Sequence, residues 1–189
     1  MAKKGFYELQ IAGLTRQLPI CKISDELSIA GFVIFGDVEL TRACAAEMIK
    51  IMPEHDIMIT AESKGIPLIY EIARQLDNER YLIARKSVKL YMKDPKGVEV
   101  HSITTAKKQE LFIDSEDAAL MKDKRVVIID DVISTGESLR ALEKLVATAG
   151  GKVVACMAIL AEGDAKYRDD IKCIGWIPLL DGKGEPMDH

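Results

Sequence analysis

The chain has 189 residues, of which 48% are hydrophobic and 30% are charged, and its formal net charge is −4. These values indicate one globular domain with a hydrophobic core. They exclude a disordered chain and give no sign of a nucleic-acid-binding surface. No run of about eighteen apolar residues is present, so no membrane span is expected. The opening "MAKKGFYELQIAG" lacks the long apolar segment of a signal peptide.

The cysteines point to a reducing compartment. Cys21, Cys44, Cys156 and Cys173 are far apart and form no CxxC pair, so neither a disulfide framework nor a zinc site is predicted. We expect all of them to be buried free thiols in a cytoplasmic protein.

The first helix is predicted after an irregular N-terminal segment. Asp37 is a suitable N-cap for the stretch 38–52, and Pro53 follows its end. Residues 1–36 and the tail after Ala161 are less regular and are expected to form a small cap.

The middle of the chain alternates apolar runs of strand length with amphipathic helical patterns. The predicted strands are 56–61, 80–85, 124–130 and 152–161, and the predicted helices are 65–76 and 137–150. Apolar runs without alternation, separated by helices, indicate a mostly parallel sheet with helices on both faces. The stretch 86–112 interrupts this rhythm and is predicted to be a flexible loop over the site.

One strand leads directly into polar residues. The stretch "VVIIDDVISTGES" (Val126–Ser138) places Asp130 and Asp131 after four apolar residues, at the sheet edge where ligands of α/β proteins bind. Its turn contains hydroxyls and Gly136 and opens the next helix, so its backbone N–H groups can surround a phosphate. The pattern is neither GxxxxGK[ST] nor GxGxxG.

This stretch resembles the signature with which type I phosphoribosyltransferases bind 5-phosphoribosyl 1-pyrophosphate (PRPP). The resemblance implies a single domain, 1–189, with a central mostly parallel sheet flanked by helices, a flexible loop at about 86–112, and a hood formed by about 1–36 and 162–189. It implies that Asp130 and Asp131 are catalytic, hold the ribose hydroxyls, and contact Mg²⁺ indirectly, through PRPP or water. The residues implied for the 5′-phosphate are Ser134, Thr135, Gly136, Glu137 and Ser138.

Two further stretches resemble pyrophosphate-binding segments of the family. "AESKG" is similar to a loop that often contains a non-proline cis peptide, and "ARKSVKL" is similar to the "RKPGKL" run of adenine phosphoribosyltransferases. The implied pyrophosphate-binding residues are Ala61, Glu62, Ser63, Lys64, Gly65, Arg85, Lys86 and Lys89. A cationic cluster suits a multiply charged leaving group.

The resemblance implies a pentosyltransferase that joins a purine base to PRPP with Mg²⁺ and forms a homodimer. Adenine, giving AMP and pyrophosphate, is favoured because Ser134 replaces the acid of hypoxanthine-guanine enzymes. In addition, the lysine that these enzymes place beside the 6-oxo group is not clearly in place: Glu162 and Gly163 stand nearest, and Lys166 lies further along.

The stretch "GFVIFGD" resembles the hood motif of the adenine enzymes, which implies that Val33 or Ile34, together with Phe35, contacts the base. The family's arginine is Gly36 here, and a core strand at 32–35 is the alternative.

Other functions stay open. They are a xanthine or hypoxanthine/guanine enzyme, and a PRPP-sensing regulator on the same fold. Such regulators usually add a winged-helix domain, for which the N-terminal segment is expected to leave no room. The loop glutamate of adenine enzymes aligns with Thr105, while Glu99 and Glu110 lie nearby, so no general acid is assigned.

Overall fold

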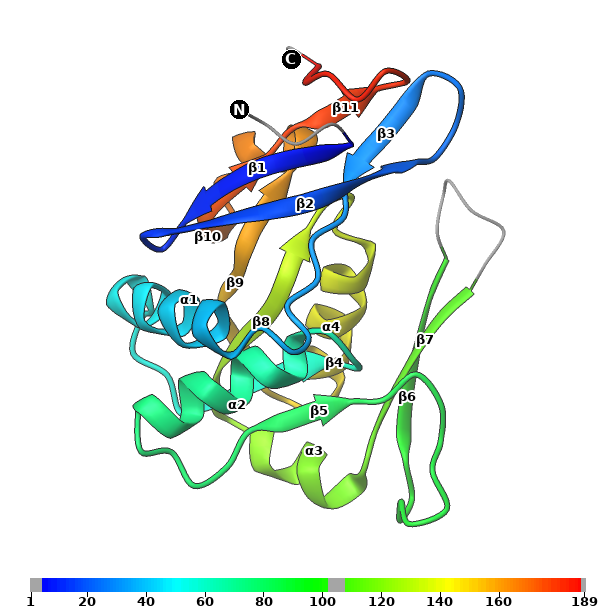
Figure 1. Ribbon diagram of the computed structural model, residues 1–189. Coiled ribbons are helices and arrows are strands. Elements are labelled where there is room, and N and C mark those ends of the chain that lie inside the picture. Colours follow the sequence, from blue (N-terminus) through cyan, green and yellow to red (C-terminus); the bar gives the residue numbers. More distant parts are fainter. Residues whose placement is uncertain (1–4, 102–107, 188–189) are drawn as a thin grey trace.

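The computed structural model describes residues 5–101 and 108–187 (Figure 1). A five-stranded sheet in the order β10-β9-β8-β4-β5 forms its centre, and every neighbouring pair is parallel. The parallel sheet predicted from the apolar runs is therefore confirmed. Its strands are β4 (Ile57–Ala61), β5 (Leu82–Ala84), β8 (Arg125–Ile133), β9 (Lys152–Glu162) and β10 (Ile171–Ile177).

Helices cover both faces of this sheet because β8 buries side chains on both. Val127 and Ile129 join the hydrophobic cluster of α1 (Val38–Ile51) and α2 (Gly65–Gln75). Val126 and Ile128 join the cluster of α3 (Ser115–Met121) and α4 (Glu137–Thr148) on the other face. The predicted N-cap of α1 is present, since the Asp37 carboxylate accepts a 3.0 Å hydrogen bond from the Leu40 N–H.

A second, four-stranded antiparallel sheet in the order β1-β2-β3-β11 forms the hood, at the top of Figure 1. Its strands are β1 (Phe6–Ile11), β2 (Leu14–Lys22), β3 (Leu27–Ala30) and β11 (Leu179–Asp181). Leu9, Leu18 and Leu180 pack into the same cluster as α1 and α2, so the hood shares the main core.

The C-terminal part of the hood prediction needs a correction. In the described part of the segment, 162–187, the strand that joins the hood sheet is β11; β10 is an edge strand of the central sheet, and a 3₁₀ helix, η1 (Gly163–Tyr167), precedes it. Ile171 and Ile177, at the two ends of β10, are buried and hold the strand against β9. The single tryptophan and short apolar run there did not stand out as a strand in the sequence.

The segment predicted as a flexible loop contains a hairpin, β6 (Lys96–His101) and β7 (Lys108–Ile113). Val98, Leu111 and Ile113 are buried in the α4 cluster, so the base of the hairpin belongs to the core. Thr105 lies outside the described residues.

The cysteine prediction holds only in part. All four thiols are unpaired, and Cys44 and Cys156 are buried; Cys173 is half-buried and Cys21, on the hood, is exposed. In the described part of the chain, no helix is both long enough and apolar enough to cross a membrane.

Candidate active site

A cavity of about 400 Å³ opens where β4 and β8 end. The hairpin β6–β7 lines it together with three segments that are distant from one another in the sequence: residues 61–64, Lys86, and the stretch 130–138. Its lining consists of Ala61, Glu62, Ser63, Lys64, Lys86, Glu110, Leu111, Asp130, Asp131, Val132 and Ser138. The tertiary structure thus brings Asp130 and Asp131, the carboxylate pair, together with most of the loop after β4. It also brings in Lys86, which belongs to the basic segment, residues 84–90. Gly65, Arg85 and Lys89 lie outside the lining.

The carboxylate pair lies inside β8 and not at its end, because Val132 and Ile133 continue the pairing with β9. Asp131 is only 3% exposed, and Lys64 Nζ lies 3.2 Å from its Oδ2 in an ion pair. That oxygen has no hydrogen-bond partner among the described residues. A buried acceptor of this kind is normally satisfied by a ligand or water.

Asp130 is the adjacent, less buried carboxylate, and its Oδ1 accepts a 2.9 Å hydrogen bond from the Asp131 N–H. Burial in the first place, and then repulsion from Asp131, raise the pKa of Asp130 to about 7.

A smaller pocket of about 140 Å³ lies over the turn between β8 and α4. Asp130, Val132 and Ser138 line both pockets, so the two are adjacent. Gly136 has φ +76° at the N-cap of α4, a backbone conformation that glycine adopts without strain. The N-terminus of α4 and the turn hydroxyls make this pocket suitable for one phosphate group. All five residues of the predicted phosphate turn line it: Ser134, Thr135, Gly136, Glu137 and Ser138.

The loop after β4 turns sharply toward the cavity. The peptide bond between Glu62 and Ser63 is cis, as the resemblance implied for this loop. Gly65 starts α2 so close to β4 that a Cβ there would collide with Thr60 Oγ1. Glycine is therefore needed for the approach of helix to strand.

The basic segment is tied to both the loop and the hairpin. The backbones of Arg85 and Phe112 exchange two hydrogen bonds of 2.7 and 2.8 Å. Glu62 accepts a 3.1 Å hydrogen bond from the Lys86 N–H and lies 3.2 Å from Arg85 Nη2 and 3.9 Å from Lys89 Nζ. The backbone N–H of Lys86, followed by the Arg85 side chain, lowers the pKa of Glu62, so this carboxylate is ionised at neutral pH.

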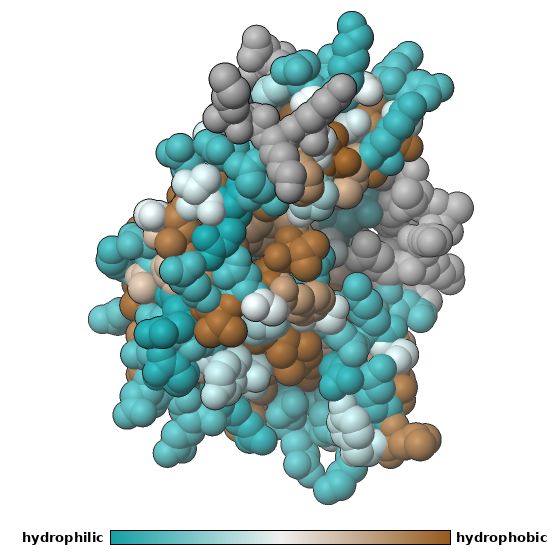
Figure 2. Space-filling model, viewed as in Figure 1, coloured by the Kyte–Doolittle hydropathy of each residue, from teal (hydrophilic) through white to brown (hydrophobic). Residues whose placement is uncertain are grey.

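The residues implied for the base are split between core and surface. The segment 31–37 is not a strand, which removes the alternative of a core strand at 32–35. Ile34 is fully buried, whereas Val33 is 56% and Phe35 is 48% exposed, so only these two offer side chains to a ligand. None of the three lines the 400 Å³ cavity. Brown, apolar atoms in Figure 2 gather on the face between the hood and α2, where this segment runs.

Sequence reasoning missed part of the surroundings of the site. Trp176, near the end of β10, is 51% exposed, and Lys166 Nζ lies 4.6 Å from its ring centroid. The guanidinium of Arg168 lies against Gly136 and is held by two hydrogen bonds of 2.9 and 2.6 Å to Asp170. The sequence placed Glu162 and Gly163 nearest the expected base, with Lys166 further along, and nothing in it signals the contact between Arg168 and the turn.

The donor set is compatible with a hard divalent cation held partly by ligand oxygens. Within residues 5–101 and 108–187, no three His, Cys, Asp or Glu side chains converge as a metal site. Asp130 and Asp131 supply two adjacent carboxylates to the cavity, and Mg²⁺ typically takes one or two carboxylates and completes its shell with phosphate oxygens and water.

The family model of the phosphoribosyl transferase domain matches residues 39–182. The chain is 30% identical over 155 residues to a hypoxanthine/guanine phosphoribosyltransferase of Methanocaldococcus sp. (strain FS406-22), covering 77% of this chain and 74% of that protein. It is 32% identical over 154 residues to the enzyme of the same name from Methanococcus vannielii, covering 77% and 78%.

Solved structures show the same fold at lower identity. Adenine phosphoribosyltransferase from Thermoanaerobacter pseudethanolicus superposes with a TM-score of 0.62 at 20% identity, covering 93% of this chain and 98% of that one. The adenine enzyme from Rhodothermus marinus gives 0.62 at 21% identity, covering 93% and 96%. The family match over most of the chain and the shared fold establish that this protein belongs to the type I phosphoribosyltransferase family.

Proposed function

We propose that the protein transfers the phosphoribosyl group of PRPP to a purine base and releases pyrophosphate. The observation that carries the proposal is that two adjacent pockets share Asp130, Val132 and Ser138, so that the turn Ser134–Ser138, the two carboxylates and Lys86 lie around neighbouring cavities. PRPP presents a 5′-phosphate, two ribose hydroxyls and a pyrophosphate in the same order.

The proposed roles follow from this order. The turn Ser134–Ser138 binds the 5′-phosphate, and Asp130 and Asp131 accept hydrogen bonds from the ribose hydroxyls. The loop 61–65, with Arg85, Lys86 and Lys89, binds the pyrophosphate. Mg²⁺ bound with PRPP beside the two carboxylates would neutralise part of the pyrophosphate charge.

The bond between ribose C1 and the pyrophosphate oxygen breaks, and its electron pair leaves with pyrophosphate. A purine ring nitrogen forms the new bond to C1 and loses its proton. The transition state resembles an oxocarbenium ion, so nearby carboxylates stabilise its positive charge while the basic segment stabilises the leaving group.

For the base, we propose a 6-oxopurine, hypoxanthine or guanine, as the first candidate. Relatives that are 30–32% identical over about three quarters of this chain carry that name. Lys166, just past β9 and above the Trp176 ring, offers the cation that a 6-oxo group would need. Adenine is the second candidate, favoured by Ser134 and by the exposed Phe35 in a hood-like segment.

Assays with a set of purine bases test both the proposed transfer reaction and the proposed choice of base. The protein is incubated with PRPP, Mg²⁺ and either adenine, hypoxanthine, guanine or xanthine, and nucleotide formation is followed by chromatography. We expect the highest kcat/KM with hypoxanthine or guanine; a higher value with adenine reverses the order of the bases. Absence of nucleotide from every purine, with PRPP still bound, supports the PRPP-sensing regulator instead.

We also propose that the protein is a cytoplasmic homodimer, as the family resemblance implies. Exposed Val38 on α1 and Tyr70 on α2 offer apolar surface for a second copy. Light scattering after size exclusion tests the dimer: a single species of monomer mass contradicts it.

A further inference from the structure

Glu62 is a carboxylate in the wall of the cavity, directed at the basic segment. Its oxygens lie 3.2 Å from Arg85 Nη2, 3.9 Å from Lys89 Nζ and 3.1 Å from the Lys86 backbone N–H. The Glu62 side chain is 24% exposed, so these charges face each other with limited solvent between them. The carboxylate thus uses donors from all three basic residues proposed to hold pyrophosphate.

The basic segment still has a hydrogen-bond donor that no acceptor in the described part of the chain uses. Arg85 Nη1 donates to Tyr91 Oη at 2.7 Å, while its Nε is buried and has no hydrogen-bond partner among the described residues. A buried guanidinium nitrogen without an acceptor is a costly arrangement, so Glu62 and Tyr91 do not satisfy every donor of Arg85. The cluster is therefore paired with one carboxylate but not saturated by it.

We propose that Glu62 acts as an internal counter-ion that occupies the pyrophosphate-binding donors in the free enzyme and competes with pyrophosphate for them. The inference rests on the proposed function and specifies how its leaving-group site is regulated. Pyrophosphate must either displace the carboxylate or bind beside a like charge, and both lower its affinity. A weaker hold on pyrophosphate favours release of this product after each turnover.

A positioning role for Glu62 would change pyrophosphate affinity in the opposite direction. If Glu62 served to orient Arg85 and Lys89 for the substrate, its removal would disorder these side chains and weaken pyrophosphate binding. The sign of the change therefore distinguishes a competing counter-ion from a positioning residue.

The test is Glu62→Gln, which keeps the shape and the acceptor for the Lys86 N–H but removes the charge. Calorimetric titration with pyrophosphate in Mg²⁺ and steady-state kinetics are compared with the wild type. We expect pyrophosphate to bind about tenfold more tightly and the KM for PRPP to fall, with the KM for the base unchanged. Glu62→Asp, which keeps the charge, should raise the affinity for pyrophosphate less than Glu62→Gln does.

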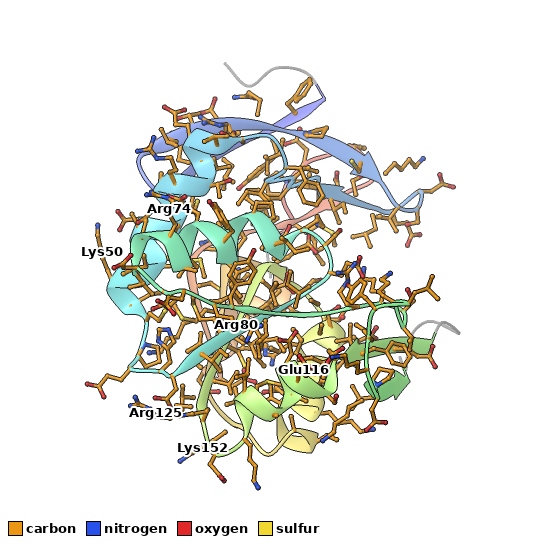
Figure 3. The ribbon with its side chains drawn as sticks, turned by 90° about the horizontal axis from the view of Figure 1, so that it is seen from below. Lys50, Arg74, Arg80, Glu116, Arg125 and Lys152 are labelled. Carbon is orange, nitrogen blue, oxygen red and sulfur yellow. The ribbon has the colours of Figure 1, made fainter. Side chains whose placement is uncertain are left out.

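Glu54→Gln is the matched control, because it also removes one negative charge. It breaks an ion pair with Arg125 at the opposite end of the sheet, where Figure 3 shows Arg125 beside Lys152. A similar gain in this variant would reflect net charge alone and would overturn the proposal. Glu62→Ala provides a second neutral variant, and thermal unfolding checks that each variant is folded.

Unchanged or weaker pyrophosphate binding in folded Glu62→Gln and Glu62→Ala overturns the inference. The titration needs no turnover, so it is separate from the assays with purine bases. A wild type that makes nucleotide while the variants show no gain refutes the role of Glu62 and leaves the proposed function intact.

Discussion

Asp131 illustrates how strongly a single side chain of this protein is constrained by its surroundings. It sits in a parallel strand, is 3% exposed, and faces Lys64 across 3.2 Å. Its Oδ2 has no hydrogen-bond partner among the described residues, and a buried acceptor of this kind costs free energy unless a ligand or water satisfies it. Its position therefore supports contact with the ribose hydroxyls.

Asp131→Asn should lower kcat/KM about 100-fold without unfolding the protein, because a charge-assisted hydrogen bond to the substrate is lost while the shape is kept. The measurement is steady-state kinetics with circular dichroism as a fold check. Asp117→Asn, which changes a partly buried carboxylate on α3 outside the cavity, should have no effect. Undiminished turnover of Asp131→Asn would contradict the ribose role.

Lys86→Ala should raise the KM for PRPP about tenfold and leave the KM for the base nearly unchanged, because the cavity loses a cation facing the pyrophosphate. Initial rates with each substrate varied in turn measure both constants. Lys93→Ala is the control, since Lys93 pairs with the exposed Glu116 and does not line the cavity. Equal changes in the two KM values would argue against a pyrophosphate role.

At the scale of elements, α4 joins the core to the phosphate turn. Leu139, Leu142 and Leu145 are buried on its inner face, as the periodicity predicts, and they fix where the helix begins. Both ends of the helix contain a glycine with positive φ, Gly136 at +76° and Gly150 at +81°. Only the first of them faces the phosphate pocket.

Gly136→Ala and Gly150→Ala should each lower the free energy of unfolding by about 1 kcal/mol, because alanine is strained in this conformation. Only Gly136→Ala should also weaken inhibition by ribose 5-phosphate, since its Cβ would collide with Arg168 Nη1 and displace the turn. A Cβ at Gly150 meets nothing closer than Lys122 Cγ at 3.6 Å. Equal loss of ribose 5-phosphate affinity in both variants would refute the phosphate turn.

At the scale of the whole molecule, the partly buried carboxylate of Asp130 lowers the free energy of unfolding at neutral and alkaline pH. Burial and Asp131 raise the pKa of Asp130 from 3.8 to about 7, so the folded state binds this proton more tightly than the unfolded chain does. The contribution of Asp130 to the free energy of unfolding is thus most favourable at low pH and falls as pH rises from about 4 to 7.

Asp130→Asn should therefore be more stable than the wild type at pH 8, on the order of a few kcal/mol, since one pKa unit corresponds to about 1.4 kcal/mol. The difference should shrink at pH 5, where the wild type keeps the proton. Urea unfolding at the two pH values measures it, and activity should be lost in the same variant. A stability difference that does not change with pH would show that Asp130 has an ordinary pKa.

The sequence by itself determined the central architecture, because local periodicity and burial agree there. The helices predicted at 38–52, 65–76 and 137–150 are Val38–Ile51, Gly65–Gln75 and Glu137–Thr148, and the predicted strands are β4, β5, β8 and β9. The signature after Val126 also predicted that Asp130 and the turn Ser134–Ser138 lie together at one pocket wall, since its residues are consecutive in the chain.

Only the tertiary structure decided the features that depend on contacts between distant segments. It placed β10 at the edge of the sheet, Arg168 against Gly136, and Lys166 over Trp176. It also brought Glu62 to the basic segment and buried the base of the hairpin against α4. Such contacts leave no periodic pattern in the sequence, because their partners are set by the packing of whole elements and not by neighbours along the chain.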